Sequence, residues 1–152
     1  MLLHIPQVLT LAQVTEIRQL LDTTEHWTNG RQSAGSQAQK IKNNLQLDVH
    51  SELYQAISSA ILNTLKQQLL IQSAALPKHI LRPMLNCYQD SGNYGNHVDN
   101  AIHTCSDTGQ LIRTDVSLTL FLSNPDEYEG GELVVEDNYG MHEVKLDAGD
   151  AI

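Results

Sequence analysis

The hydrophobic pattern of the chain changes at Pro83, and this change limits the folds that the chain can adopt. Two earlier segments, residues 9–21 and 51–70, carry apolar side chains at spacings of three and four, which is typical of amphipathic helices. After Pro83, shorter alternating runs predict strands at residues 84–89, 115–122, 132–136 and 142–146. Helices followed by several short strands predict an α+β fold, with two N-terminal helices packed on one sheet of a β-sandwich or barrel.

Capping residues and glycines mark the ends of these elements. Thr10 is placed to cap the first helix. Residues 27–44 are polar and show little periodicity, so we expect a mobile loop or a short ribbon there. The Asn138-Tyr139-Gly140 segment is typical of a hairpin turn, and Gly130-Gly131 is typical of a strand entry that needs a positive φ.

The length of 152 residues suits a single hydrophobic core. We expect one structural domain overall. In it, residues 1–76 form the helical region with its polar loop, and residues 77–152 form the strand-rich core.

The composition excludes several classes of function. Nine Lys and Arg against 18 Asp and Glu give a formal net charge of −9, which argues against binding to nucleic acid or to anionic membranes. No apolar run approaches the ~20 residues of a membrane span, and the N-terminus lacks the features of a signal peptide. Cys87 and Cys105 are too few for a disulfide framework. We therefore expect a cytoplasmic protein without nucleic-acid or membrane partners.

The His97-Val98-Asp99 tripeptide carries the clearest chemistry. On a strand, residues i and i+2 point to the same face, so an imidazole and a carboxylate would lie side by side. Such a pair supplies two of the three ligands of a 2-His-1-carboxylate site for non-haem Fe(II). The tripeptide alone is a weak signal, because it arises often by chance, and by itself it favours a hydrogen-bonded His–Asp pair in a surface loop.

The surrounding sequence resembles a known family. Residues 86–99 (NCYQDSGNYGNHVD), 113–123 (RTDVSLTLFLS) and 128–133 (YEGGEL) are similar, in this order, to blocks of the prolyl 4-hydroxylase-like dioxygenases. Residues 27–35 (WTNGRQSAG) and 42–47 (KNNLQL) resemble a narrower group, the bacterial PKHD-type hydroxylases, which are associated with iron uptake. The resemblance covers nearly the whole chain, and its specificity comes from the combination of blocks.

This resemblance implies a fold, an activity and a set of cofactors. The implied fold is a double-stranded β-helix, or jelly-roll, with the two helices packed on its larger sheet. The implied activity is hydroxylation by Fe(II), with 2-oxoglutarate as cosubstrate, O2 as oxidant and ascorbate as reductant. The substrate is a small molecule or a peptide whose identity stays open, and a homo-oligomer is possible in such a family.

The resemblance also assigns roles to individual residues. His97 and Asp99 would bind the metal, and Tyr88 would donate a hydrogen bond to 2-oxoglutarate, although an ordinary core tyrosine is the alternative. Tyr94 would line the substrate entrance, with packing in a turn as its alternative. Arg31, Lys42 and Asn44 would lie on a lid over the site, with a solvated polar loop as theirs.

The predicted strand at residues 115–122 has two different faces. Val116, Leu118, Leu120 and Leu122 would pack on the helices, while Asp115, Ser117, Thr119 and Phe121 would line the cavity. Some relatives have a Tyr at the position of Phe121. Because a Phe cannot hydrogen-bond a carboxylate, Thr119 would carry more of the contact with 2-oxoglutarate. The alternative is a strand with its polar face in solvent.

The third metal ligand is not identified in this sequence. The family places a distal His shortly after the turn at Gly149-Asp150, followed by an Arg or Lys that pairs with the far carboxylate of 2-oxoglutarate. The sequence stops at Ile152, so we expect the C-terminal strands to be missing and residues 1–152 alone to lack turnover. His103, expected in a solvated loop, and His142, expected at a core edge, are weaker candidate ligands.

Two other classes of function stay open at this point. A non-catalytic β-sandwich binding module, or an inactive fragment without the third metal ligand, would share the same sequence pattern. A metal-binding cupin-like sandwich is a further alternative, but it would usually supply more histidines near the first pair.

Overall fold

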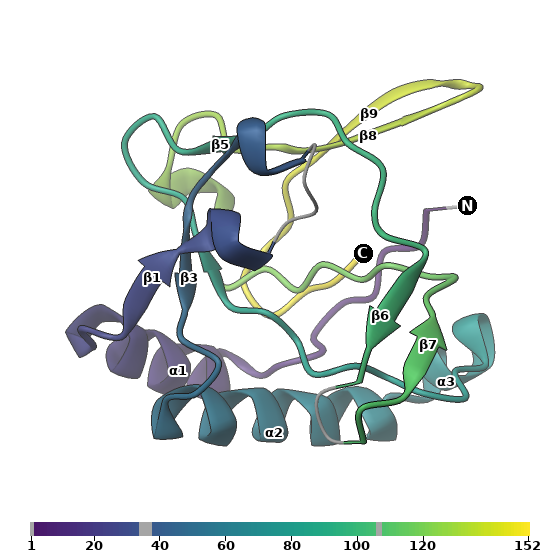
Figure 1. Cartoon of the computed structure of the whole chain (residues 1–152), viewed down its shortest axis with the longest axis horizontal. Helices are drawn as coiled ribbons and strands as arrows, with labels where there is room; N and C mark the ends of the chain where they lie inside the picture. The colour runs from purple at the N-terminus through teal and green to yellow at the C-terminus, as the bar shows by residue number, and fades with distance from the viewer. Residues whose placement is uncertain (1, 34–37, 106–107) are drawn as a thin grey trace. The chain divides into compact units, whose positions relative to one another are not determined.

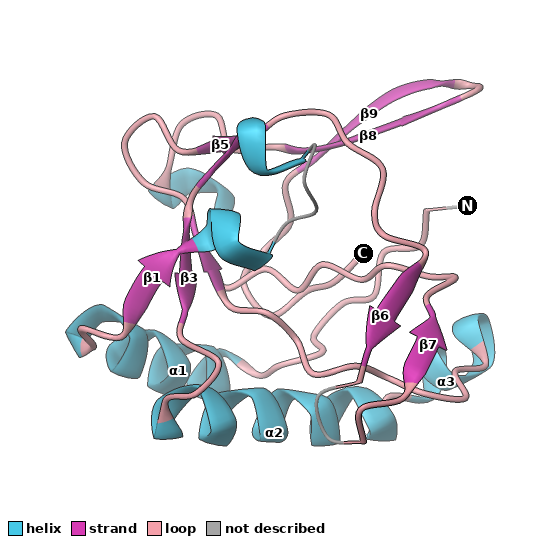
Figure 2. Ribbon diagram, in the orientation of Figure 1, coloured by secondary structure: helices cyan, strands magenta, loops and turns pink. Residues whose placement is uncertain are grey.

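Three helices and several short antiparallel strands form the part of the chain that the structure, a computed structural model, describes: residues 2–33, 38–105 and 108–152 (Figures 1 and 2). The expected α+β class is therefore confirmed. By their internal contacts the residues form two compact units, Thr24–Ser117 and Met1–Thr23 with Leu118–Ile152. These units are described separately, and the domain division expected at residue 76 stays a prediction.

The unit Thr24–Ser117 contains a three-stranded antiparallel sheet with β3 (Leu45–Leu47) between β1 (Trp27–Asn29) and β4 (Asn86–Cys87) (Figure 1). Its register pairs Thr28 with Gln46 and Gln46 with Asn86. Beside it, β2 (Lys42–Asn43) pairs with β5 (Asn93–Tyr94), so that Lys42 lies opposite Tyr94. The expected strand at 84–89 is therefore shorter than predicted, because only Asn86 and Cys87 are register partners of β3.

The polar segment 27–44 contains β1, β2 and two short 3-10 helices, Gly30–Ser33 and Ala38–Lys40. The expected short ribbon is thus partly confirmed, since β1 and β2 each pair with other strands. Residues 34–37 of the expected loop lie outside the described residues.

The second predicted helix forms as two helices, α2 (Glu52–Gln67) and α3 (Leu69–Ala75). Ser51 caps α2 by accepting a hydrogen bond from the backbone N–H of Tyr54 at 3.1 Å. Ile57, Ile61 and Leu65 of the predicted apolar stripe are buried. The stripe does not extend as far as predicted: Leu69 is 82% exposed, because the extended backbone of Gln68 separates α3 from α2.

A second hairpin in this unit pairs β6 (Ile102–Thr104) with β7 (Leu111–Arg113). His103 therefore lies on a strand, opposite Ile112, and is partly buried, so its expected place in a solvated loop is wrong. The sequence pattern did not reveal this hairpin, because His103 and Thr104 interrupt the apolar alternation.

The unit of the two chain ends contains α1 (Leu11–Thr23), whose Val14 and Ile17 are buried. Thr10 caps this helix as predicted. Its Oγ1 accepts a hydrogen bond from the backbone N–H of Gln13 at 3.3 Å, and the Gln13 side chain accepts one from the Thr10 backbone N–H at 2.9 Å. This reciprocal pair satisfies two backbone donors around the start of the helix.

Replacing Thr10 by alanine is expected to lower the free energy of unfolding by about 1 kcal/mol, because the cap is lost. Thr15→Ala is the matched control. Its hydroxyl only donates to the Leu11 carbonyl one turn earlier in the same helix, which leaves the capping pair intact. Urea denaturation followed by circular dichroism measures both variants. Equal stability of the two variants would contradict the capping role.

The same unit carries a ribbon of β8 (Leu133–Asp137) and β9 (Gly140–Val144) (Figure 2). Asp137 pairs with Gly140, so the hairpin turn predicted at residues 138–140 is confirmed. Gly130 and Gly131 have φ values of 63° and 70°, as their expected role at a strand entry requires. His142 is exposed and its Nε2 lies 3.8 Å from an Asp137 carboxylate oxygen, so its expected place at a core edge is wrong.

The strand predicted at residues 115–122 forms only in part. Thr119 and Phe121 exchange backbone hydrogen bonds with Ile152, Asp150 and Gly149, whereas Val116 is 67% exposed. The predicted packing face is therefore wrong for Val116, because the pairing begins only at Thr119. Within the described residues, no helix is both long enough and apolar enough to cross a membrane.

Candidate metal centre

His97 and Asp99 follow β5, on a segment that leaves the sheet. The backbone pairing with β2 continues only to Gly95, whose N–H donates to the Ile41 carbonyl at 3.2 Å. The expected strand at His97 and Asp99 is therefore wrong, because this segment is not assigned to a strand. The two side chains nevertheless meet: Nε2 of His97 lies 3.3 Å from Oδ1 of Asp99.

A hydrogen bond from the imidazole fixes which nitrogen of His97 is free. Nδ1 lies 2.8 Å from the Gly95 carbonyl oxygen, and a carbonyl oxygen can only accept a hydrogen bond. Nδ1 must therefore carry a proton and donate it. In the neutral imidazole this leaves the lone pair of Nε2 directed at Asp99. Ligating histidines are commonly oriented in this way, by a backbone carbonyl that holds the other ring nitrogen.

The remaining Nε2 and Oδ1 atoms form a pair of acceptors that needs a cation between them. Two lone pairs at 3.3 Å repel each other unless a proton or a metal ion lies between them. Two ligands at ~2.1 Å on adjacent positions of an octahedral metal are roughly 3 Å apart, so the observed separation fits a shared metal ion. The site is accessible, since the side chains of His97 and Asp99 are 24% and 67% exposed.

Tyr94 holds the imidazole ring of His97 in place. The two rings are stacked, with centroids 3.7 Å apart and planes inclined by 20°. Burial and the nearby charge of Asp99 raise the pKa of the Tyr94 phenol, so Tyr94 stays a neutral hydroxyl group beside the pair. The same ring also contacts Lys42, whose Nζ lies 5.0 Å from the ring centroid.

A row of buried polar side chains leads away from Tyr94. Lys42, Asn44 and Gln46 occupy alternate positions of an extended run, and all three are buried. Asn86, an exposed residue of β4, contacts this row: its Oδ1 accepts hydrogen bonds from Asn44 at 3.0 Å and from Gln46 at 3.2 Å. Oδ1 of Asn44 is buried beside Gly30 and has no hydrogen-bond partner among the described residues.

Sequence reasoning missed Gln46 as a member of this row and Asn86 as its contact. The alternation of polar residues in 42–47 was visible, but the same pattern is typical of a strand with its polar face in solvent. Only the structure shows that this polar face is turned inward. Gly30 was also missed: any side chain at this position would collide with Asn44.

The other predicted site residues have different positions. Arg31 lies in the 3-10 helix Gly30–Ser33, and its Nε donates to the Lys42 carbonyl at 2.7 Å. Tyr88 directly follows β4 and is 47% exposed, and burial of its phenol together with Tyr94 raises its pKa. Thr119 belongs to the other unit, where its backbone pairs with Ile152. Its expected contact with 2-oxoglutarate stays a prediction.

A third metal ligand does not emerge from the described part of the chain. No group of three His, Cys, Asp or Glu side chains suited to a metal ion occurs within residues 2–33, 38–105 and 108–152. The structure thus offers one imidazole and one carboxylate at this centre. The roles of His97, Asp99, Tyr88, Thr119, Tyr94, Arg31 and Asn44 stay predictions.

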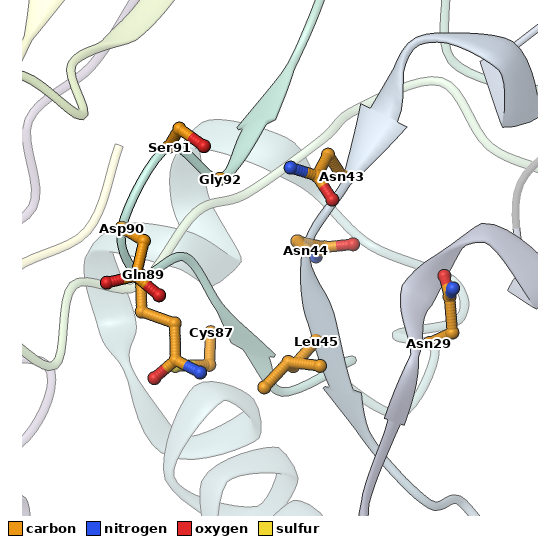
Figure 3. A pocket seen from close by; sticks show the side chains of 9 residues that line it. All are labelled: Asn29, Asn43, Asn44, Leu45, Cys87, Gln89, Asp90, Ser91 and Gly92. Carbon is orange, nitrogen blue, oxygen red and sulfur yellow. The ribbon is translucent and has the colours of Figure 1, made fainter.

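A separate pocket of about 260 Å³ lies against the sheet of β1, β3 and β4 (Figure 3). Asn29, Leu45 and Cys87 are register partners and line it, together with Asn44 of the polar row. The residues that line this pocket do not include His97 or Asp99. It is therefore distinct from the candidate metal centre.

The fold and the site together define an α+β protein in which an imidazole and a carboxylate, His97 and Asp99, lie 3.3 Å apart. No family model matches the chain. Curated relatives do match it over all 152 residues: PKHD-type hydroxylases of Aliarcobacter butzleri (49% identical), Acinetobacter baylyi (47%) and Hyphomonas neptunium (48%). The chain spans 66–67% of the length of these relatives. It belongs to the PKHD-type hydroxylase family.

Proposed function

We propose that the gene product containing this chain is an Fe(II)- and 2-oxoglutarate-dependent hydroxylase. The observation that carries the proposal is the close approach of Nε2 of His97 to Oδ1 of Asp99, at 3.3 Å. The membership of the chain in a family of hydroxylases supports it. When bound, Fe(II) with 2-oxoglutarate and O2 would supply the oxidising chemistry that turns a substrate C–H bond into C–OH and releases succinate and CO2.

The residues of the chain have positioning roles in this proposal. Gly95 and Tyr94 orient the imidazole of His97, so that a metal ion finds its ligand already in place. Tyr88 and Thr119 donate hydrogen bonds to the cosubstrate. Tyr94, Arg31 and Asn44 line the space in which the substrate binds. Residues 2–33, 38–105 and 108–152 supply two of the three ligands in this proposal, His97 and Asp99.

The proposal extends to the fold and the setting. The described strands belong to a double-stranded β-helix, whose two sheets would enclose the metal centre. Ascorbate keeps the iron reduced, and the protein acts in the cytoplasm on a small molecule or a peptide, in a process linked to iron uptake. No membrane or nucleic acid takes part, in keeping with the net charge of −9.

The test uses the complete gene product with Fe(II), 2-oxoglutarate and ascorbate, and measures succinate. We expect Fe(II)-dependent succinate formation in the wild type and its loss in His97→Ala. His26→Ala is the control, because it removes another exposed imidazole from the same unit. Equal succinate formation by the wild type and His97→Ala would overturn the proposal. Metal binding without any succinate would favour the non-catalytic binding module.

A further inference from the structure

Lys42 is a buried cation that has no acidic partner in the described part of the chain. The residue is only 4% exposed. Its Nζ donates one hydrogen bond, to Oγ of Ser33 at 3.0 Å, and lies 5.0 Å from the centre of the Tyr94 ring. Among the residues that the structure describes, no carboxylate lies within ion-pairing distance of it. Two of the three N–H donors of the ammonium group thus have no partner in the described chain.

Burial of the Lys42 ammonium group lowers the stability of the protein when no ligand is bound. Burying an ammonium group costs free energy unless an anion or several hydrogen bonds compensate it. Consistently, burial lowers the pKa of Lys42. More exposed cations of the same chain do have acidic partners: Arg113 pairs with Asp115 at 2.8 Å, and Arg18 pairs with Glu127. The most deeply buried of these three cations therefore lacks the partner that the exposed ones have.

The position of Lys42 links it to the candidate metal centre. The β2–β5 register places it directly opposite Tyr94, and the Tyr94 ring stacks on His97. Arg31, a second cation, donates a hydrogen bond from its Nε to the Lys42 carbonyl of the same strand. No carboxylate of the described residues pairs with Arg31. Two cations, Lys42 and Arg31, are thus connected through Tyr94 to His97, in a protein whose net charge is −9.

We propose that Lys42 is the carboxylate-binding group of this site, and that its ammonium pairs with a carboxylate of a ligand bound next to His97 and Asp99. The inference rests on the proposed function, because it deepens the account of the same site. The carboxylate has two possible sources, 2-oxoglutarate or the substrate. In either case the ligand supplies the negative charge that the described residues do not supply, and Ser33 and Tyr94 hold the ammonium ready for it.

The first experiment compares binding and stability in Lys42→Met, with Lys66→Met as the matched control on the exposed side of α2. The probe is glutarate, which carries two carboxylates but no 2-oxo group to chelate a metal. We expect Lys42→Met to bind glutarate ten- to a hundredfold more weakly than the wild type, as loss of a charge-assisted hydrogen bond implies. Ligand-observed NMR titration of the metal-free protein measures this.

The melting temperature of the ligand-free protein separates this role from a structural one. Methionine fills a similar volume without the cost of a buried charge, so Lys42→Met should melt at the same temperature as the wild type or higher. If Lys42 only stabilises the fold, Lys42→Met will melt at a lower temperature than the wild type and bind glutarate with the same affinity. Should the methionine variant fail to fold, Lys42→Gln carries the same comparison, and Lys42→Arg should restore binding in part.

The second experiment identifies the source of the carboxylate. Mn²⁺ serves as a redox-stable substitute for Fe(II), and calorimetry measures the affinity for 2-oxoglutarate in the complete gene product. If Lys42 binds the cosubstrate, Lys42→Met weakens 2-oxoglutarate binding by the same factor as glutarate binding. If Lys42 binds the substrate, Lys42→Met leaves the affinity for 2-oxoglutarate unchanged. In that case the wild type saturated with 2-oxoglutarate still binds glutarate, whereas the saturated variant does not.

The two proposals can fail independently. Equal glutarate affinity in the wild type and Lys42→Met, or no measurable glutarate binding by the wild type, would overturn the role of Lys42 whatever the metal does. Failure of the gene product to bind Mn²⁺ or to form succinate would overturn the hydroxylase proposal. The metal-free glutarate comparison would then still decide whether Lys42 binds carboxylates.

Discussion

Asp99→Ala is expected to weaken Fe(II) or Mn²⁺ binding by at least about a hundredfold. Groups that only orient a ligand already change metal affinity ~10–100-fold when they are removed, and Asp99 is proposed to be a ligand itself. Its carboxylate also supplies the negative charge that compensates a divalent cation. Calorimetric titration of the complete gene product with Mn²⁺ measures the effect.

The folding of this variant should be nearly unchanged. The Asp99 side chain is 67% exposed, and exposed substitutions typically change the free energy of unfolding by less than about 0.5 kcal/mol. Asp22→Ala is the control, since it removes an exposed carboxylate from α1 without touching the His–Asp pair. Unchanged Mn²⁺ affinity in Asp99→Ala would identify the pair as a proton-bridged ion pair, which is the simpler alternative left open by the sequence.

The sequence predicted local features well where neighbouring residues alone decide them. The Thr10 cap, the hairpin turn before Gly140 and the positive φ of Gly131 depend on a few adjacent residues, and all three are present. The meeting of His97 with Asp99 was also foreseen. The two side chains meet at 3.3 Å although the expected strand does not form there.

The sequence predicted poorly what depends on distant partners. The segment around Val116 has strand-like alternation, yet a strand forms only where another segment pairs with it, and pairing begins at Thr119. The position of His142 was misjudged for a similar reason, because alternation with Val144 does not say which face of the ribbon is covered. The burial of Lys42 could not be read from the pattern either, since lysine on an alternating strand normally faces solvent.

Leu47 anchors the three-stranded sheet in the hydrophobic core of its unit. It ends the central strand β3, its side chain is fully buried at 0% exposure, and its backbone N–H donates to the Leu85 carbonyl at 3.0 Å. Gln46, the residue before it, belongs to the polar row. Truncation at Leu47 therefore tests whether the row depends on the hydrophobic core of this unit.

We expect Leu47→Ala to lower the free energy of unfolding by about 2–5 kcal/mol, because the truncation leaves a cavity and loses buried apolar surface. Leu69→Ala is the matched control: it makes the same chemical change where the side chain is 82% exposed, and it should alter stability by less than about 0.5 kcal/mol. Urea denaturation followed by circular dichroism measures both variants. A loss below about 1 kcal/mol in Leu47→Ala would contradict its place in the core.

The affinity of the folded Leu47→Ala variant for Mn²⁺ should stay within a few-fold of the wild type, because the truncation does not touch His97 or Asp99. This measurement distinguishes damage to the core from damage to the metal centre.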